Sequence, residues 1–349
     1  MISFLRRNRS SVGLDVGSGF AKLVVIDHSG PQPELVHVSH TPLVSDAIVE
    51  GEVMDPHLVV EAIRALVEAS GQKLRDVVTS VGGRDVIVKR IKMDRLKESD
   101  AREVIRWEAE QNVPFDMENV QLDFEILDPH EDGLQMNVLL VAAKRDLVEE
   151  RVSLLREAGV SPSVVDVDSF ALHNALEYNY PEAMEGTVAL VNVGHEFSTV
   201  NVMQDGQPVL TRDLPFGSRR QREELRRVHG LSAEEAEAVV QGQSERADEF
   251  AGMLADSGEE LALGIERAAA FLSINEGVEA GLQRVYLCGG GSRLPGLVDV
   301  VGSRLRARTE IANPLQRLRV RPGATASFPV ADLAPMLMLP IGLALRSAA

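Results

Sequence analysis

The chain has 349 residues, of which 36 are lysine or arginine and 53 are aspartate or glutamate, so its formal net charge is −17. A length near twice the usual domain of about 150 residues predicts two domains or one fold made of two lobes. The negative balance opposes a phosphate backbone and argues against nucleic-acid binding, while a hydrophobic content of 44% argues against extended disorder.

The cysteine content and the apolar segments of the chain indicate the cellular compartment in which the protein is found. Cys288 is the single cysteine, so it cannot form an internal disulfide, which is typical of a reducing environment. Residues 1–9 lack the apolar core of a secretory signal. The longest apolar run, residues 336–345, is half of the roughly 20 residues that a membrane span needs. We expect a soluble cytoplasmic protein, with work beside a membrane left open.

The first 81 residues predict a β-meander followed by a helix and a strand. Residues 11–16 and 20–26 are apolar runs joined by Gly17-Ser18-Gly19, which indicates a hairpin, and a third strand is expected near residues 35–38. Residues 57–67 have apolar side chains at helical spacing, with Asp55 as the cap. Residues 77–81 then predict a further strand.

Residues 84–160 predict a small module of their own, with the order β-α-β-β-α. The expected strands are residues 86–91, 120–126 and 136–142, with a turn at residues 131–133. Asp100 and Glu103 resemble a capping box at the start of the first helix, and a helix over residues 145–158 closes the module. This order predicts an antiparallel sheet covered by helices on one face.

The second half of the chain again predicts strands followed by helices. A strand at residues 164–167 and a helix through residues 170–176 precede a second meander, at residues 188–193, 198–203 and 208–213. A long helical region rich in charge follows, over roughly residues 219–272. The strand at residues 284–287 ends in three glycines.

Two segments match each other at a constant offset of 177 residues, which aligns Asp15 with Asn192 and Gly17 with Gly194. Because both segments open a β-meander, the chain is expected to contain two similar lobes that face each other. A chance match of two short apolar strands is the alternative.

Two tight glycine turns that face each other could hold one polyphosphate, because backbone N–H groups approach phosphate oxygens freely where no Cβ intervenes. The polar residue before each turn would reach a hydrated metal ion brought by the phosphates. Lys22, on the strand after the first turn, would supply a positive charge. The candidate residues are Asp15, Gly17, Ser18, Gly19, Lys22, Asn192 and Gly194.

The third candidate element is the glycine cluster Gly289, Gly290 and Gly291 with Ser292, between a strand and a helix. Such a turn offers a flat backbone surface for a nucleoside, with a phosphate near the helix N-terminus. The sequence contains neither Gly-Lys-Ser/Thr nor G-x-G-x-x-G in these clusters, which excludes a P-loop and a dinucleotide fingerprint.

Together these motifs resemble the actin and sugar-kinase/Hsp70 ATP-binding superfamily. Residues 13–22, 191–199 and 287–296 look like its first phosphate loop, second phosphate loop and adenosine motif. The closer resemblance is to the PilM family of type IV pilus assembly, carried by residues 13–18, 211–217, 231–237 and 266–271. The resemblance implies an α/β, two-lobed actin-like ATPase fold with an inserted FtsA-type 1C subdomain.

The resemblance also implies a division of the chain. Residues 1–10 form an N-terminal tail, and residues 84–160 form subdomain 1C in the position that FtsA and PilM use. Subdomain 1A takes residues 11–83, 161–188 and 335–349; subdomain 2A takes residues 189–230 and 285–334; subdomain 2B takes residues 231–284.

By the same resemblance, the protein is an adaptor that binds ATP and Mg2+, with Asp15 near the metal through water. It would bind the cytoplasmic N-terminal peptide of PilN in a groove involving subdomains 1A and 1C. That peptide would connect it indirectly to PilO and the pilus motor, at the cytoplasmic face of the inner membrane. Self-association and a type II secretion counterpart stay open.

Three positions depart from the family's pattern. Asn192 stands where the second loop usually has Asp, Gly264 where many relatives have Glu, and residues 239–241 where a Lys is common. The last two family positions are expected near the nucleoside. These departures predict that hydrolysis is slow or absent.

Two other function classes remain as alternatives. An ATPase or small-molecule kinase on the same fold would need a catalytic aspartate near the phosphates, and none stands out in the sequence. An FtsA-like filament protein is the other alternative. His195 is expected to be a loop histidine without catalytic partner, Cys288 a small buried side chain, and Trp107 half-buried on the module's first helix.

Overall fold

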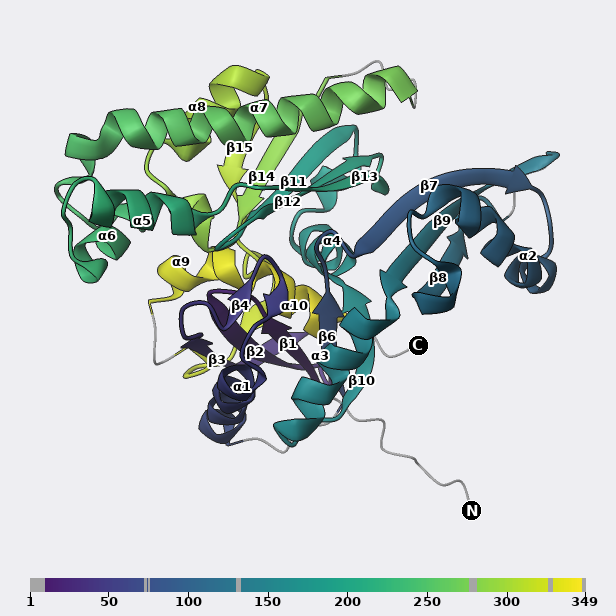
Figure 1. The fold of residues 1–349 in the computed structure, drawn as a ribbon, viewed down its shortest axis with the longest axis horizontal. Helices are drawn as coiled ribbons and strands as arrows, with labels where there is room; N and C mark the ends of the chain where they lie inside the picture. The colour runs from purple at the N-terminus through teal and green to yellow at the C-terminus, as the bar shows by residue number, and fades with distance from the viewer. Residues whose placement is uncertain are drawn as a thin grey trace.

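The protein consists of two lobes and a projecting module (Figure 1). The structure is a computed structural model that describes residues 10–71, 74, 76–129, 133–275, 281–325 and 329–346. Each lobe is built on one mixed β-sheet. Among the described residues, none of the helices combines the length and the apolar character needed to cross a bilayer.

The sheet of the first lobe has the strand order β10-β6-β1-β2-β3-β16. Strands β1, β2 and β3 form the predicted antiparallel meander, and β6 and β10 continue the sheet in parallel beyond β1. The bounds are β1 (Ser10–Val16), β2 (Phe20–Asp27), β3 (Glu34–Pro42), β6 (Val77–Val81), β10 (Pro162–Val167) and β16 (Arg319–Val320).

The sheet of the second lobe repeats this plan with the order β13-β12-β11-β14-β15. Its meander precedes two parallel strands, as in the first lobe. The bounds are β11 (Thr187–Val193), β12 (Ser198–Gln204), β13 (Gln207–Leu214), β14 (Arg284–Cys288) and β15 (Arg308–Ile311).

The two meanders have the same register. Asp15 on β1 pairs with Lys22 on β2, and Asn192 on β11 pairs with Thr199 on β12. Both pairs stand one step before the tight turn, so the offset of 177 residues relates equivalent positions of two equivalent sheets. The predicted two-lobed fold is confirmed, and the chance-match alternative is excluded.

Helices cover the outer faces of the sheets and fill the layer between them. Side chains that alternate along β1 and β2 pack on α1 and α3 on one face, and on α4 and α10 on the other. The layer of α4 and α10 also contacts β11 and β14, so both lobes share this core. The bounds are α1 (Pro56–Ser70), α3 (Arg145–Glu157), α4 (Asp168–Asn179), α9 (Val330–Leu333) and α10 (Met338–Leu345).

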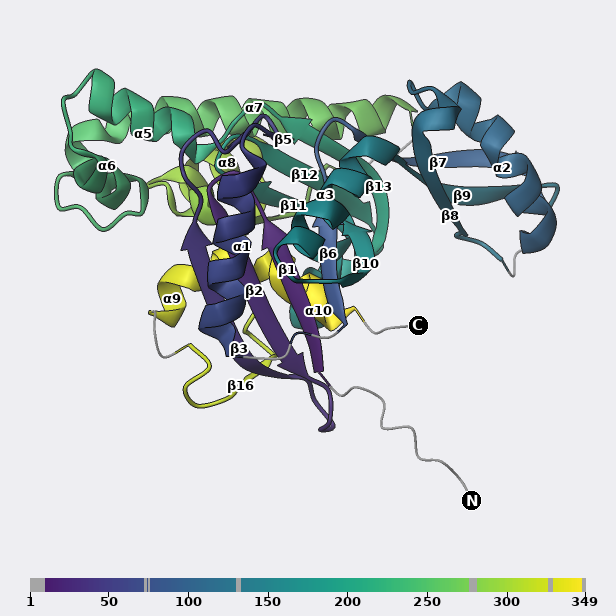
Figure 2. The same cartoon turned by 60° about the horizontal axis from the view of Figure 1, so that its bottom comes forward.

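The long helical region expected over residues 219–272 divides into three helices on the outer face of the second lobe (Figure 2). Ser232 and Glu235 form a capping box that starts the second of them. The bounds are α5 (Ser218–Arg227), α6 (Ala233–Val240) and α7 (Ala251–Asn275), with α8 (Leu297–Leu305) beside α7.

The module projects from the side of the two lobes (Figure 1). Its antiparallel sheet has the order β7-β9-β8, and α2 covers one face through a separate apolar core. The bounds are β7 (Val86–Asp94), α2 (Glu98–Asn112), β8 (Val120–Ile126) and β9 (Gln135–Lys144). Of the turn expected at residues 131–133, only Gly133 lies within the described residues.

Two local expectations for the module are wrong. The helix expected to close it, α3, packs instead in the core of the first lobe, because Leu154 and Leu155 are buried among residues of α1 and β1. The capping box at Asp100 does not form: α2 begins at Glu98 with Lys97 at the cap, and Asp100 lies in the first turn. An acidic side chain there still favours the positive end of the helix dipole.

Candidate functional site

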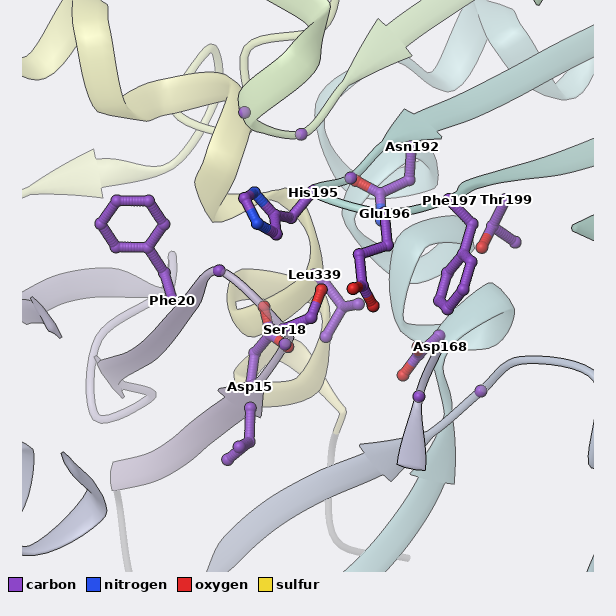
Figure 3. Close-up of a pocket in the computed structure, with 18 of the residues that line it drawn as sticks. Asp15, Ser18, Phe20, Asp168, Asn192, His195, Glu196, Phe197, Thr199 and Leu339 are labelled. Atoms are coloured by element: carbon purple, nitrogen blue, oxygen red, sulfur yellow. The ribbon is translucent and has the colours of Figure 1, made fainter. Parts of the chain in front are cut away.

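A cavity of about 170 Å³ lies between the lobes, at the ends of β1, β11 and β14 (Figure 3). Asp15 and Ser18 line it from the first lobe, and Asn192, His195 and Glu196 line it from the second. The candidate residues that the structure brings to its lining are Asp15, Gly17, Ser18, Gly19, Lys22, Asn192, Gly194, Gly289 and Gly290.

The two glycine turns are closed by the same hydrogen bond. The Gly17 N–H donates to the Phe20 carbonyl at 3.1 Å, and the Gly194 N–H donates to the Phe197 carbonyl at 3.0 Å. The turns face each other closely, because a Cβ on Gly19 would lie 3.1 Å from Cβ of His195. A side chain at position 19 would therefore fill the space between the turns.

The N-terminus of α5 is already used by the second turn. The Ser218 N–H donates to the Gly194 carbonyl at 3.1 Å, and the Arg219 N–H donates to the His195 carbonyl at 2.8 Å. These bonds satisfy two of the helix's free amides and fix the turn relative to α5. An anion in the cavity would accordingly depend on the amides of the turns rather than on this helix end.

The equivalent polar positions differ in charge. Asp15, with 7% of its surface exposed, forms an ion pair with Lys22. Asn192 packs against the turn that follows β14, where a Cβ on Gly289 would overlap the Asn192 amide oxygen. The first lobe thus supplies a carboxylate with a nearby ammonium, and the second supplies a neutral amide.

The glycine cluster after β14 divides into two parts. Gly289 has φ of +83° and its N–H donates to the Pro335 carbonyl at 2.8 Å, while Gly290 lies beside Met336. Gly291 and Ser292 do not line the cavity, which corrects their selection as candidates. The Ser292 hydroxyl is buried and donates to the Gly289 carbonyl at 2.8 Å, and a Cβ on Gly291 would press on Val193.

Asp168 is the lining residue that sequence reasoning missed most clearly. It is the first residue of α4, and its carboxylate lies over Gly82, where any Cβ would overlap it. Burial raises the pKa of Asp168 to about 6; the Ser80 hydrogen bond and the Arg151 charge oppose this rise, and the charges of Asp15 and Asp213 add to it. The available signal was an acid directly after a strand and at the start of a helix.

Three more lining residues were not among the candidates, although two of them lie on strands of the predicted second meander. Arg151, on α3, donates to the Val16 carbonyl at 2.9 Å; burial lowers its pKa, and the charges of Asp168 and Asp15 oppose that effect. Thr199 donates to Asp213 at 2.7 Å, and burial raises the pKa of Asp213. No catalytic aspartate stood out in the sequence, yet the structure brings Asp168 and Asp213 to the lining beside Asp15.

His195 is held neutral at physiological pH. Burial lowers its pKa to about 4, and the positive charges of Arg222 and Arg219 add to that effect. A neutral ring beside the turns matches the expectation of a loop histidine. Cys288 is buried as expected, and burial raises the pKa of its thiol.

The positions expected near a nucleoside separate in the structure. Gln241 lines the cavity together with Arg222, which forms an ion pair with Glu237 on α6. Gly264 does not line the cavity, so the expectation that its position lies near the nucleoside is corrected. Gly264 lies on α7, where a Cβ would press on Leu214. Its lack of a side chain is explained by helix packing.

Metal-ligating side chains are sparse. Within the described ranges, histidine, cysteine, aspartate and glutamate form no group of three or more suited to hold a metal ion. Asp15, already paired with Lys22, fits the outer shell of a hydrated Mg2+ whose remaining ligands come from phosphates and water.

Comparison with known proteins decides the family. The family described as "Type IV pilus assembly protein PilM" matches residues 13–348. The chain belongs to the PilM family. The solved structure of a "PilM-PilN type IV pilus biogenesis complex" has 29% identity and a TM-score of 0.83, covering 96% of this chain and 98% of that chain.

More distant relatives share the actin-like fold of the PilM family. EutJ from Carboxydothermus hydrogenoformans has 19% identity and a TM-score of 0.57, with 97% of this chain and 90% of that chain covered. MreB 5 of Spiroplasma citri, bound to AMPPNP, has 11% identity and a TM-score of 0.50, with 96% and 95% covered.

Among curated proteins, the cell division protein FtsA of Bacillus subtilis (strain 168) is 23% identical over 261 residues. The match covers 67% of this chain and 58% of FtsA. The chain therefore spans less than two thirds of the length of this relative.

Proposed function

We propose that this PilM-family protein is an adaptor of the type IV pilus machine that binds ATP between its two lobes and binds the N-terminal peptide of PilN. One observation carries the nucleotide part: two glycine turns at equivalent register, one from each lobe, bound the same cavity. The fold shared with an AMPPNP-bound relative supports it.

The residues have distinct proposed roles. Free amides in the turns at Gly17–Gly19 and after Gly194 contact the polyphosphate from opposite sides. Lys22 adds a positive charge, and Asp15 orients water in the shell of a phosphate-bound Mg2+. Gly289 and Gly290 supply a flat surface for the nucleoside, with Gln241 and Arg222 at its edge.

The partner proposal has separate support. The PilM-family structure that covers almost all of this chain is a complex with PilN. We place the peptide between the proposed subdomains 1A and 1C, and through it an indirect connection to PilO and the motor. The protein would then work at the cytoplasmic face of the inner membrane as a peripheral component.

An ATPase is the second candidate, because a specific observation favours it. Asp168, with its pKa near 6, and Asp213 both line the cavity, so protonatable carboxylates stand where phosphates would lie. Phosphate release measured with and without the PilN peptide separates the two: turnover below about one per minute supports the adaptor, and peptide-stimulated rapid turnover supports the enzyme.

Calorimetry tests the adaptor proposal directly. The purified chain is titrated with ATP in the presence of Mg2+, and separately with a synthetic peptide of the PilN N-terminus and the same residues in scrambled order. We expect saturable binding of ATP and of the native peptide only. If the titration with ATP shows no binding, the nucleotide proposal is wrong. If the native and scrambled peptides bind equally well, the partner proposal is wrong.

Trp107 provides an internal reporter for the peptide. It is the single tryptophan, and 74% of its surface is exposed on α2 of the module, which corrects the expectation of a half-buried side chain. A peptide bound against the module shifts its fluorescence, whereas ATP alone leaves the emission maximum unchanged. Trp107→Phe serves as the blank.

A further inference from the structure

A segment of the first lobe crosses to the second phosphate turn. This strap, residues 43–54, contains the short hairpin β4 (Ile48–Val49) and β5 (Glu52–Val53). Its two turn residues, Glu50 and Gly51, have φ of +50° and +84°, as a type I′ turn requires. Glycine or asparagine is usual at the first of these positions, so a glutamate there is strained.

The strained residue makes a contact between the lobes. The Glu50 N–H donates to Glu196 Oε2 at 2.8 Å. Glu196 lies in the second glycine turn and lines the cavity, and its side chain is 9% exposed. The strained backbone at Glu50 thus directs its own N–H group toward Glu196 of the second lobe.

Arg219 joins the same contact from α5. Its Nη2 donates to Asp46 on the strap at 2.7 Å, and its Nη1 donates to Glu196 Oε1 at 3.1 Å. Its Nε donates to Glu223 on its own helix at 2.7 Å, which holds the guanidinium in place. Arg219 itself is absent from the lining of the cavity and so acts on it through Glu196.

Nucleotide passage requires this region to open. The cavity measures about 170 Å³, which is below the roughly 300–1,000 Å³ of small-molecule sites. Its walls meet where Gly19 faces His195, and Phe197 lies against Gly51 of the strap. Because the space between these contacts is small, we expect the first and second lobes to separate when a nucleotide enters or leaves.

We infer that Asp46, Glu50, Glu196 and Arg219 form an interlobe bridge that gates nucleotide entry and release, with Arg219 as its positioning residue. The inference rests on the proposed nucleotide site. A gate is crossed in both directions, so its loss accelerates association and dissociation together. A residue that contacts the nucleotide would instead accelerate dissociation alone and weaken affinity.

The size of the effect follows from exposure. Arg219 and Asp46 are 31% and 61% exposed, so each pair is partly screened by water. We expect Arg219→Ala to raise kon and koff by about three- to tenfold each, with Kd changed by less than about twofold.

Stopped-flow fluorescence with mant-ATP measures both rates, the dissociation rate by a chase with excess ATP. The variants are Arg219→Ala, Asp46→Ala and the double variant, in which the two effects are expected not to add. Arg220→Ala is the matched control, because Arg220 is the next residue on α5 and pairs with Glu260 within the second lobe. Its rates should equal those of the unmodified protein.

Two results overturn the gate. Either Arg219→Ala has the rates of Arg220→Ala, or it raises koff with kon unchanged and Kd weakened in proportion. If the unmodified protein binds no mant-ATP, the proposed function fails, and a second measurement then judges the bridge by itself.

That measurement is the distance between the lobes by pulsed electron resonance, without nucleotide. Spin labels are placed at Glu68→Cys on α1 and Arg226→Cys on α5, both exposed, while the native Cys288 is buried. We expect Arg219→Ala to lengthen and broaden the distance distribution and Arg220→Ala to leave it unchanged. An unchanged distribution in both variants contradicts the bridge.

Discussion

Asp168 places a largely buried carboxylate in the lining of the cavity, and this has a cost for the folded protein. Because burial raises its pKa to about 6, the folded protein holds a proton that the unfolded chain releases above pH 4. The free energy of unfolding therefore falls as pH rises from about 4 to 6 and stays lowered above that window.

Asp168→Asn should remove this penalty while keeping a hydrogen-bonding partner for Ser80. We expect the variant to be more stable than the unmodified protein at pH 8, by up to about 3 kcal/mol, and equally stable near pH 4. Urea unfolding at both pH values measures the difference. Glu68→Gln, which removes an exposed carboxylate on α1, is the control; a gain independent of pH would contradict the explanation.

Lys22 and Asp15 form a pair that the neighbouring strands hold in register. Lys22→Ala leaves a nearly buried carboxylate without its cation, so we expect a loss of about 1–3 kcal/mol in the free energy of unfolding. Adding Asp15→Asn to that variant should recover part of the loss, because the amide carries no charge. Denaturant titration of both single variants and the double variant tests this; additive losses would disprove the pairing.

At this scale, the sequence located the residues of the glycine turns because a fixed offset relates them. It did not locate Arg151 or Asp168, since each reaches the cavity from a helix that only the tertiary fold brings there. It also missed Asp213, although the strand of Asp213 was expected in the second meander. Gly291 was wrongly expected at the site for a related reason. A run of glycines in the sequence does not show which of these residues line the cavity and which pack on Val193.

At the scale of elements, two helical glycines have opposite environments. Gly342 on α10 lies against α4, where a Cβ would overlap the Ala171 carbonyl, whereas a Cβ on Gly252 of α7 meets nothing within 4 Å. The first glycine lets two helices approach in the shared core; the second has no such role.

We therefore expect Gly342→Ala to destabilise the protein by about 3 kcal/mol or more, because backbone atoms cannot move aside. Gly252→Ala should be neutral or stabilise by up to about 1 kcal/mol through helix propensity. Thermal unfolding of the two variants gives the comparison. Similar melting temperatures for both would show that α4 and α10 pack less closely than described.

The hairpins and most helices were predictable from local periodicity, and Asp55 caps α1 as expected. The assignment of α3 to the module was wrong because amphipathic spacing shows that a helix buries one face without showing against what. Leu154 and Leu155 would suit either core, and only the chain's return to β10 places them on the first lobe.

At the scale of the whole molecule, the equivalent registers of Asp15–Lys22 and Asn192–Thr199 relate the two lobes. This relation was available from the sequence. The interlobe bridge was not, because Asp46 and Arg219 are far apart in the chain and neither belongs to a repeated motif. The interlobe bridge thus comes from the strap and α5, whereas the shared core of α4 and α10 joins the lobes through the duplicated strands.

The central claim is that one nucleotide contacts both glycine turns. Hydrogen–deuterium exchange of the full chain, with and without ATP and Mg2+, tests it at residues 17–20 and 194–198 in one experiment. We predict slower exchange in both segments, with residues 98–112 of the module as an unaffected reference. Protection of one segment only, or of neither under saturating ATP, would contradict a site shared by the two lobes.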